Sequence, residues 1–108
     1  MKLENIQAQM RKGILEYCVL ALISKEEIYA SDIIDNLKKA KLLIVEGTLY
    51  PLLTRLKNAG FLAYNWKESD QGPPRKYYTI TETGKLFLGE LDKTWSDLNF
   101  SVQQLTKS

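Results

Sequence analysis

Residues 45–62 read VEGTLYPLLTRLKNAGFL, and the order of apolar and polar residues in this stretch predicts an amphipathic helix. Its leucines recur with the spacing of one helical face, so they form a single stripe that faces a core. These leucines are Leu49, Leu52, Leu53 and Leu56. Pro51 has no N–H to donate, so the helix is expected to begin just before it, near residues 46–48. Gly60 is expected to end the helix as a left-handed cap.

The opposite face of this helix is polar and carries hydrogen-bond donors of types that reach phosphates or base edges. The candidate DNA-contacting residues on this face are Thr48, Tyr50, Thr54, Arg55 and Lys57. Charge favours the same interpretation, because residues 38–85 hold nine basic and four acidic residues although the net charge of the chain is only +2. The alternative is an ordinary surface helix with a solvated face, since the periodicity specifies only amphipathicity.

A β-hairpin is predicted after this helix. Residues 61–67 and 75–81 are rich in aromatic and β-branched residues, which is typical of strands. Residues 68–74 between them are dense in turn formers. Pro73 and Pro74 cannot donate to a strand ladder, so the tip of the hairpin is expected to project.

The base of this hairpin carries cations. Arg75 and Lys76 begin the second strand and Lys67 lies on the opposing strand, where they are placed to contact a phosphate or an adjacent minor groove. The aromatic residues of the two strands are expected to pack across the strands and into the core rather than to stack on bases, because a small hairpin depends on aromatic pairs. These aromatic residues are Tyr64, Trp66, Tyr77 and Tyr78.

Two helices are predicted upstream. Residues 10–23 carry a doubled apolar stripe and form a core helix, in which Cys18 is interpreted as a small packed hydrophobe rather than a redox-sensing thiol. Residues 30–39 form a shorter helix, with Ser31 or a neighbour as its cap. Lysines near the end of this helix either complement its dipole or contact a DNA backbone. Three helices followed by a hairpin predict a winged helix-turn-helix, a mainly α fold with a small β-hairpin (α+β).

Composition excludes several functions. The chain has no histidine and a single cysteine, so we expect neither a metal site nor another cofactor. The commonest general base is absent, and no Ser or Cys nucleophile has a histidine to activate it, so an enzyme is not expected. The sequence has no recognisable targeting segment and no apolar run near the ~18 residues of a membrane span, which predicts a cytoplasmic protein that does not bind a membrane.

The C-terminal residues predict a further helix that begins at Glu82 with Thr81 as its N-cap. Its large apolar residues alternate at spacings of three and four, the pattern of a heptad seam. The seam consists of Leu88, Leu91, Trp95, Leu98, Val102 and Leu105. A homodimer interface is expected, because these side chains would otherwise form an exposed patch. The competing interpretation is packing against the first helix of the same chain, since the seam is short for a coiled coil.

Residues 46–53 (EGTLYPLL), with RL at 55–56 and GFL at 60–62, resemble the recognition-helix signature of the PadR family of bacterial transcriptional regulators. Residues 72–81 (GPPRKYYTIT) followed by Gly84 resemble the wing of that family and the start of its C-terminal helix. The resemblance implies a DNA-binding domain over residues 1–81 and a dimerisation helix over residues 82–108. It further implies a homodimeric repressor that binds double-stranded DNA, and the two-fold axis of such a dimer predicts an inverted-repeat operator.

Trp95 is the candidate effector-binding residue, because it is the only aromatic residue in the seam and its bulk makes close interdigitation there difficult. An apolar slot at this position would accept a flat aromatic compound, with Asp92 or Asp97 nearby for a cation. The alternative is a tryptophan that only packs. The PadR resemblance favours the slot, since several members of the family respond to phenolic or multidrug-like compounds at the dimer interface.

A different class of function is also open: a winged-helix module that binds proteins and not DNA. The two functions differ in what they require of the polar helix face together with Arg75 and Lys76. DNA binding requires these residues to be cationic and free to meet phosphates, whereas a protein-binding wing does not.

Overall fold

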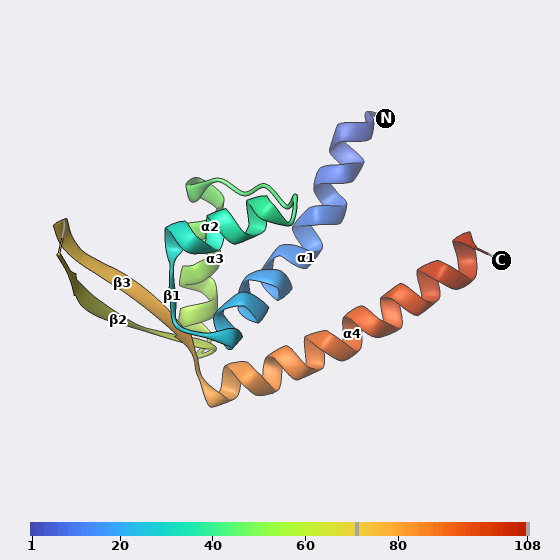
Figure 1. The fold of residues 1–108 in the computed structure, drawn as a ribbon. Coiled ribbons are helices and arrows are strands. Elements are labelled where there is room, and N and C mark those ends of the chain that lie inside the picture. The colour runs from blue at the N-terminus through green and yellow to red at the C-terminus, as the bar shows by residue number, and fades with distance from the viewer. Residues whose placement is uncertain (71, 108) are drawn as a thin grey trace.

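The computed structural model describes residues 1–70 and 72–107 of the chain. In chain order the elements are α1 (Leu3–Lys25), β1 (Ile28–Tyr29), α2 (Ala30–Lys39), α3 (Glu46–Asn58), β2 (Leu62–Ser69), β3 (Gly72–Ile80) and α4 (Glu82–Thr106). Helices α1 to α3 form the body, and the β2–β3 hairpin and α4 project from it in different directions (Figure 1). The fold is a winged helix-turn-helix with an added C-terminal helix, and the α+β prediction is confirmed.

The leucine stripe of α3 forms the centre of the core. Leu49, Leu52, Leu53 and Leu56 are all buried, as predicted. They share one apolar cluster with residues of the other helices, among them Leu20 of α1 and Ile33 and Leu37 of α2. Because α3 is held along its whole buried face, its exposed face is fixed in orientation relative to the rest of the domain.

Both ends of α3 lie where the sequence predicts them. The helix begins at Glu46, which leaves Pro51 in the early turns, and it ends at Asn58. Gly60 has a φ of 86°, and the backbone N–H groups of Gly60 and Phe61 donate to the carbonyls of Lys57 and Leu56, each at 3.0 Å. This is a left-handed glycine cap with paired terminal carbonyls, and it turns the chain directly into β2.

The N-terminal half of the domain contains the two predicted helices and differs from the prediction at the start of α2. Helix α1 begins at Leu3, so the polar residues before Met10 extend the predicted core helix. Helix α2 has the predicted bounds, but its N-cap residue is Tyr29 and no side chain caps it, so the expectation for Ser31 was wrong. The reason is that Tyr29 belongs to β1, whose pairing with β3 fixes the entry into α2.

The wing is longer than predicted. The sheet order is β1-β3-β2, and β2 and β3 pair antiparallel with Trp66 opposite Lys76 and Lys67 opposite Arg75. Pro73 and Pro74 were expected in a loop but lie within β3, because the register is irregular at this point and no regular ladder bond is required of them. Gln71, also predicted in this loop, lies outside the described residues.

Helix α4 begins at a joint that links three elements. The Thr81 hydroxyl donates to the carbonyl of Gly60 at 2.6 Å and accepts from the backbone N–H of Gly84 at 3.0 Å, so Thr81 is the predicted N-cap. Phe87 stacks on Phe61 with ring centroids 4.1 Å apart. The direction of α4 is therefore set by the corner between α3 and β2.

Helices α1 and α4 also contact each other farther along. The Tyr17 hydroxyl donates to Asp92 at 2.5 Å, and this hydrogen bond raises the pKa of Tyr17 above its ordinary value. Cys18 is half-buried against the core, and desolvation raises the pKa of its thiol, which agrees with its interpretation as a packed residue. Beyond this contact the N-terminal half of α1 and the C-terminal half of α4 diverge (Figure 1).

The described part of the chain offers neither a membrane-spanning helix nor a metal-binding cluster. No helix there is both long and apolar enough to cross a membrane. Within residues 1–70 and 72–107, no three side chains of His, Cys, Asp or Glu come close enough together to hold a metal ion.

Candidate nucleic-acid interface

Helix α3 has two exposed sides, which separate the residues predicted to contact DNA. Tyr50, Thr54 and Lys57 lie on the side toward the wing, and the wing contributes Arg75 and Lys76 to the same surface. Thr48 and Arg55 lie on the other side, toward α1. The structure thus brings together five of the seven predicted residues and places the other two across the helix from them.

On the wing side, two adjoining hollows separate α3 from the hairpin. The first has a volume of about 370 Å³ and lies between Tyr50, Trp66 and Lys76. The second has a volume of about 140 Å³ and lies between Thr54, Lys57 and Lys76. We call the two together the helix–wing hollow. Lys76 and Tyr78 of β3 border both.

The cations of this surface are held by aromatic rings and not by carboxylates. The Lys76 ammonium lies 4.0 Å from the centre of the Tyr64 ring, and the Lys57 ammonium lies 5.5 Å from the same centre. The Arg75 guanidinium lies over the Tyr29 ring and donates to its hydroxyl at 3.1 Å. Among the described residues, none of these three cations forms an ion pair, so their charge is available to an anion.

Lys67 was expected to join these cations, but it forms an ion pair with Glu27, which precedes β1. Its charge is therefore compensated within the domain. The Lys67 ammonium also lies 5.1 Å from the centre of the Tyr77 ring. Lys67 does not line the helix–wing hollow, whereas Trp66 and Lys76 do.

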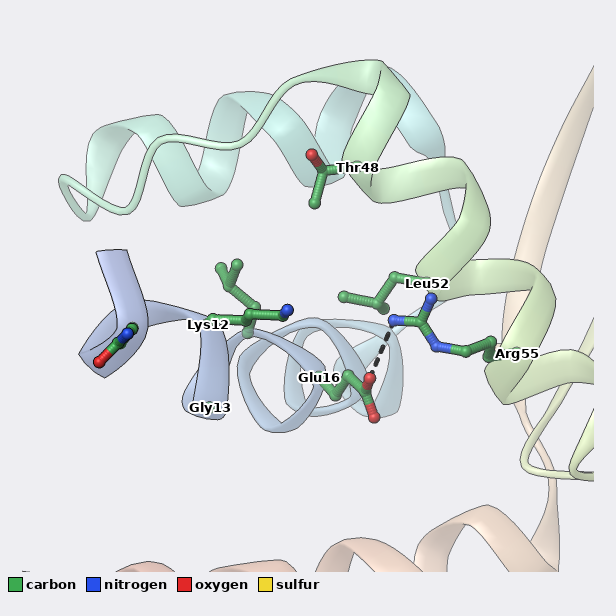
Figure 2. A pocket seen from close by; sticks show the side chains of 8 residues that line it. Lys12, Gly13, Glu16, Thr48, Leu52 and Arg55 are labelled. Carbon is green, nitrogen blue, oxygen red and sulfur yellow. Dashed lines mark hydrogen bonds and ion pairs between the residues drawn. The ribbon is translucent and has the colours of Figure 1, made fainter. Parts of the chain in front are cut away.

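On the α1 side, a hollow of about 500 Å³ lies between α1 and α3 (Figure 2). Figure 2 shows Arg55 reaching across it to Glu16, with the guanidinium nitrogen and carboxylate oxygen 3.0 Å apart, while Lys12 and Thr48 border the same space. Since 61% of the Arg55 side chain is exposed, this pair contributes at most about 1 kcal/mol to stability. It nevertheless connects the cation of α3 to the neighbouring helix.

Sequence reasoning missed several residues of this surface. Tyr29, which holds Arg75, lies in a strand of two residues, too short to give a pattern. Glu16 and Glu27 meet their partners only through the tertiary fold, so no local signal identifies them. Trp66 was expected to pack but is 63% exposed, whereas Tyr78 of the opposing strand is buried as predicted. Trp66 lies two residues after Tyr64 in β2, and this spacing does place both side chains on the same face, toward α3.

The apolar seam of α4 divides into two parts. Leu88 and Leu91 are half-buried against the core of the same chain, which was the competing interpretation. The rest of the seam is exposed, with exposed fractions of 44% for Trp95, 56% for Leu98, 52% for Val102 and 84% for Leu105. These four exposed side chains form a row along α4, and we call it the α4 stripe.

Trp95 also borders a small hollow between α1 and α4. The hollow has a volume of about 200 Å³ and is lined by Ile14, Tyr17, Cys18 and Trp95. Its lining is almost entirely apolar apart from the Tyr17 hydroxyl, which is engaged with Asp92. The hollow opens beside the α4 stripe, so any partner helix packed on the stripe would come close to it.

Several proteins resemble the chain along most of its length. It is 60% identical to a PadR-like transcription factor of Bacteroides fragilis of known structure, with a TM-score of 0.78 and coverage of 94% of this chain and 99% of the other. It is 31% identical to a PadR family regulator of Eggerthella lenta of known structure, with a TM-score of 0.89 and coverage of 98% of this chain and 93% of the other. An uncharacterised protein of Lysinibacillus sphaericus is 31% identical over 86% of this chain and 88% of its own length.

The family model of the PadR-like transcriptional regulators matches residues 19–90. The match extends from the second half of α1, through α3 and the wing, into α4, so it includes both exposed sides of the recognition helix. The chain therefore belongs to the PadR-like family of transcriptional regulators, which bind DNA and are not enzymes.

Proposed function

We propose that this protein is a sequence-specific, homodimeric repressor that places α3 in the major groove of its operator and its wing against the neighbouring backbone. The observation that carries the proposal is the helix–wing hollow, where α3 and β3 present three cations that form no ion pair with any residue the structure describes. Uncompensated cations on one convex helix and an adjacent hairpin match the charge and shape of duplex DNA.

The seven predicted residues have different roles in this proposal. Tyr50 and Thr54 lie on the exposed side of α3 and reach base edges, while Lys57, Arg75 and Lys76 contact phosphates. A helix in the major groove has a backbone strand on each side. Thr48 and Arg55 face the second strand, with Glu16 holding Arg55 in place until a phosphate replaces it.

The dimer is proposed from the α4 stripe. Four large apolar side chains in one row are unusual on a monomer and fit a second copy of the same helix related by two-fold symmetry. In this arrangement residues 1–81 bind DNA and residues 82–108 join the two copies. Occupancy of an operator by such a dimer represses transcription, and in a bacterium this takes place in the cytoplasm.

A protein-binding module without DNA affinity is the second candidate. Its support is the exposed apolar surface of the chain, but it gives no reason for three cations that no described carboxylate pairs with. The two candidates are separated by titrating labelled duplex DNA of random sequence at two salt concentrations. A DNA-binding regulator binds, and its affinity falls steeply as salt is raised. Absence of binding at the lower salt would leave the protein-binding module.

The proposed roles predict distinct effects of substitution. Arg75→Ala should weaken binding to every duplex and lower the salt slope by about one ion, because it removes a phosphate contact. Thr54→Ala or Tyr50→Phe should instead change the preference among sequences by roughly 1–3 kcal/mol, because a base-edge contact is lost. The measurement is fluorescence anisotropy with operator and random duplexes. Equal losses on all duplexes for the three variants would refute this division.

We further propose that Trp95 forms part of an effector site, in which the hollow beside it is closed by the partner α4 and accepts a flat aromatic compound. A bound compound can change DNA affinity only by changing the distance between the two recognition helices. This requires the compound to bind the dimer that fits DNA and the dimer with splayed helices with different affinities. A Trp66→Phe variant leaves Trp95 as the sole reporter. Titration of this variant with aromatic cations and phenolic acids should give saturable quenching, and the same compounds should reduce the operator affinity of the unmodified protein. If neither occurs with any compound, Trp95 only packs.

A further inference from the structure

Trp66 is the side chain on the wing that packing explains least. It lies in the middle of β2, yet 63% of it is exposed, and its ring lies edge to face with that of Tyr64, with the two ring centres 6.5 Å apart. By contrast, Tyr78 on the opposing strand is 4% exposed. An indole exposed to this extent contributes little to the core, although it is among the largest apolar side chains of the protein.

The surroundings of Trp66 alternate between rings and cations. Tyr29, Tyr50 and Trp66 border the same hollow as Arg75 and Lys76. Lys76 lies directly opposite Trp66 in the strand register, with its ammonium 5.8 Å from the indole centre. Because rings hold these cations and none of them forms an ion pair within residues 1–70 and 72–107, an incoming anion meets fixed charge without first breaking such a pair.

The position of this hollow relates it to one part of DNA. When α3 lies in a major groove and the wing reaches the adjacent minor groove, the sugar–phosphate strand between the two grooves must pass between helix and wing. That strand presents anionic phosphates separated by largely apolar deoxyribose rings. The helix–wing hollow offers a complementary surface, with cations for the phosphates and exposed rings for the sugars.

We propose that Trp66 is a DNA-contacting residue, whose indole packs against a deoxyribose of this strand while Lys76 and Arg75 hold the phosphates on either side. The contact reads no base, so it positions the recognition helix and contributes equally on all sequences. This inference rests on the proposed DNA-binding function and adds to it a residue whose contribution is apolar and therefore independent of salt.

The test separates the apolar contribution from the ionic one. Trp66→Ala should weaken binding to operator and random duplexes alike, roughly tenfold, without changing the salt slope, because no phosphate contact is lost. Trp66→Phe keeps a ring and should recover part of the affinity. Lys76→Gln should weaken binding and reduce the slope by about one. The matched control is Asn65→Ala, an exposed neighbour in β2 that borders neither part of the helix–wing hollow and should bind as the unmodified protein does.

Fluorescence gives a second readout that does not depend on loss of affinity. In a Trp95→Phe background Trp66 alone reports, and its emission should change and saturate at the same duplex concentrations as anisotropy. If duplex binds but Trp66 emission and Trp66→Ala affinity stay unchanged, this inference is overturned and the proposed function stands. If the unmodified protein fails to bind duplex, both are overturned. If single-stranded DNA binds more tightly than duplex and quenches Trp66, stacking on bases replaces the deoxyribose contact.

Discussion

Replacing Leu98 with aspartate is expected to leave the protein folded but monomeric and to lower its affinity for a two-half-site operator by roughly 100-fold or more. Leu98 lies in the α4 stripe and is 56% exposed in the single chain, so the substitution removes no intrachain core contact. In the proposed dimer it places two carboxylates against each other in an apolar seam. Sedimentation equilibrium gives the mass, and anisotropy with operator duplex gives the affinity.

A matched control separates the position from the added charge. Ser96→Asp introduces the same charge on α4, two residues away and on a different helical face, and should remain dimeric. Leu98→Asp should also keep the helical circular dichroism of the unmodified protein, because α4 is anchored at its start by Thr81 and Phe87. A Leu98→Asp protein that stays dimeric would move the interface away from the α4 stripe.

Gly84→Ala is expected to destabilise the fold by about 1–3 kcal/mol, because a Cβ at this position has no space. It would lie 2.2 Å from the carbonyl oxygen of Phe61 and 2.7 Å from Cγ1 of Ile80. The Phe61 carbonyl cannot move away freely, since it accepts from the backbone N–H of Thr81 at 3.0 Å. The start of α4 must therefore shift relative to the corner between α3 and β2.

The control for this prediction is Gly89→Ala on the same helix, where a Cβ would meet nothing within 4 Å. Alanine there removes the helix cost of glycine and should stabilise the protein by about 0.5–1 kcal/mol. Thermal unfolding at one fixed protomer concentration, required because a dimer is stabilised by mass action, should show shifts of opposite sign. If Gly84→Ala is as stable as the unmodified protein, the joint at α4 is looser than the structure indicates.

The recognition helix was predictable from sequence because its determinants are local. The leucine spacing, Pro51 and Gly60 all act within a few residues, and they placed the buried face and the end of α3 correctly. The same local chemistry identified Thr81 as the cap of α4. Three helices followed by a hairpin predicted the winged helix, and the PadR motifs predicted the family; both predictions are confirmed.

The features that were missed depend on contacts between distant segments. β1 exists because Ile28 and Tyr29 pair with β3, and this pairing replaced the expected cap of α2. The orientation of Arg55 in α3 depends on its ion pair with Glu16, which lies in α1. A heptad pattern cannot distinguish a side chain that packs within the chain from one that packs on a partner, so Leu88 and Leu98 looked alike although only Leu88 contacts the core.

The measurement that tests the central claim most directly is selection of bound sequences from a random duplex pool by the unmodified protein. The account predicts enrichment of one inverted repeat, with half-sites centred about 10 bp apart or a multiple of that spacing, because two α3 helices related by a two-fold axis must reach the same face of the duplex. A pool that binds without enrichment, or enriches a single half-site, would contradict the claim that this protein recognises an operator as a dimer.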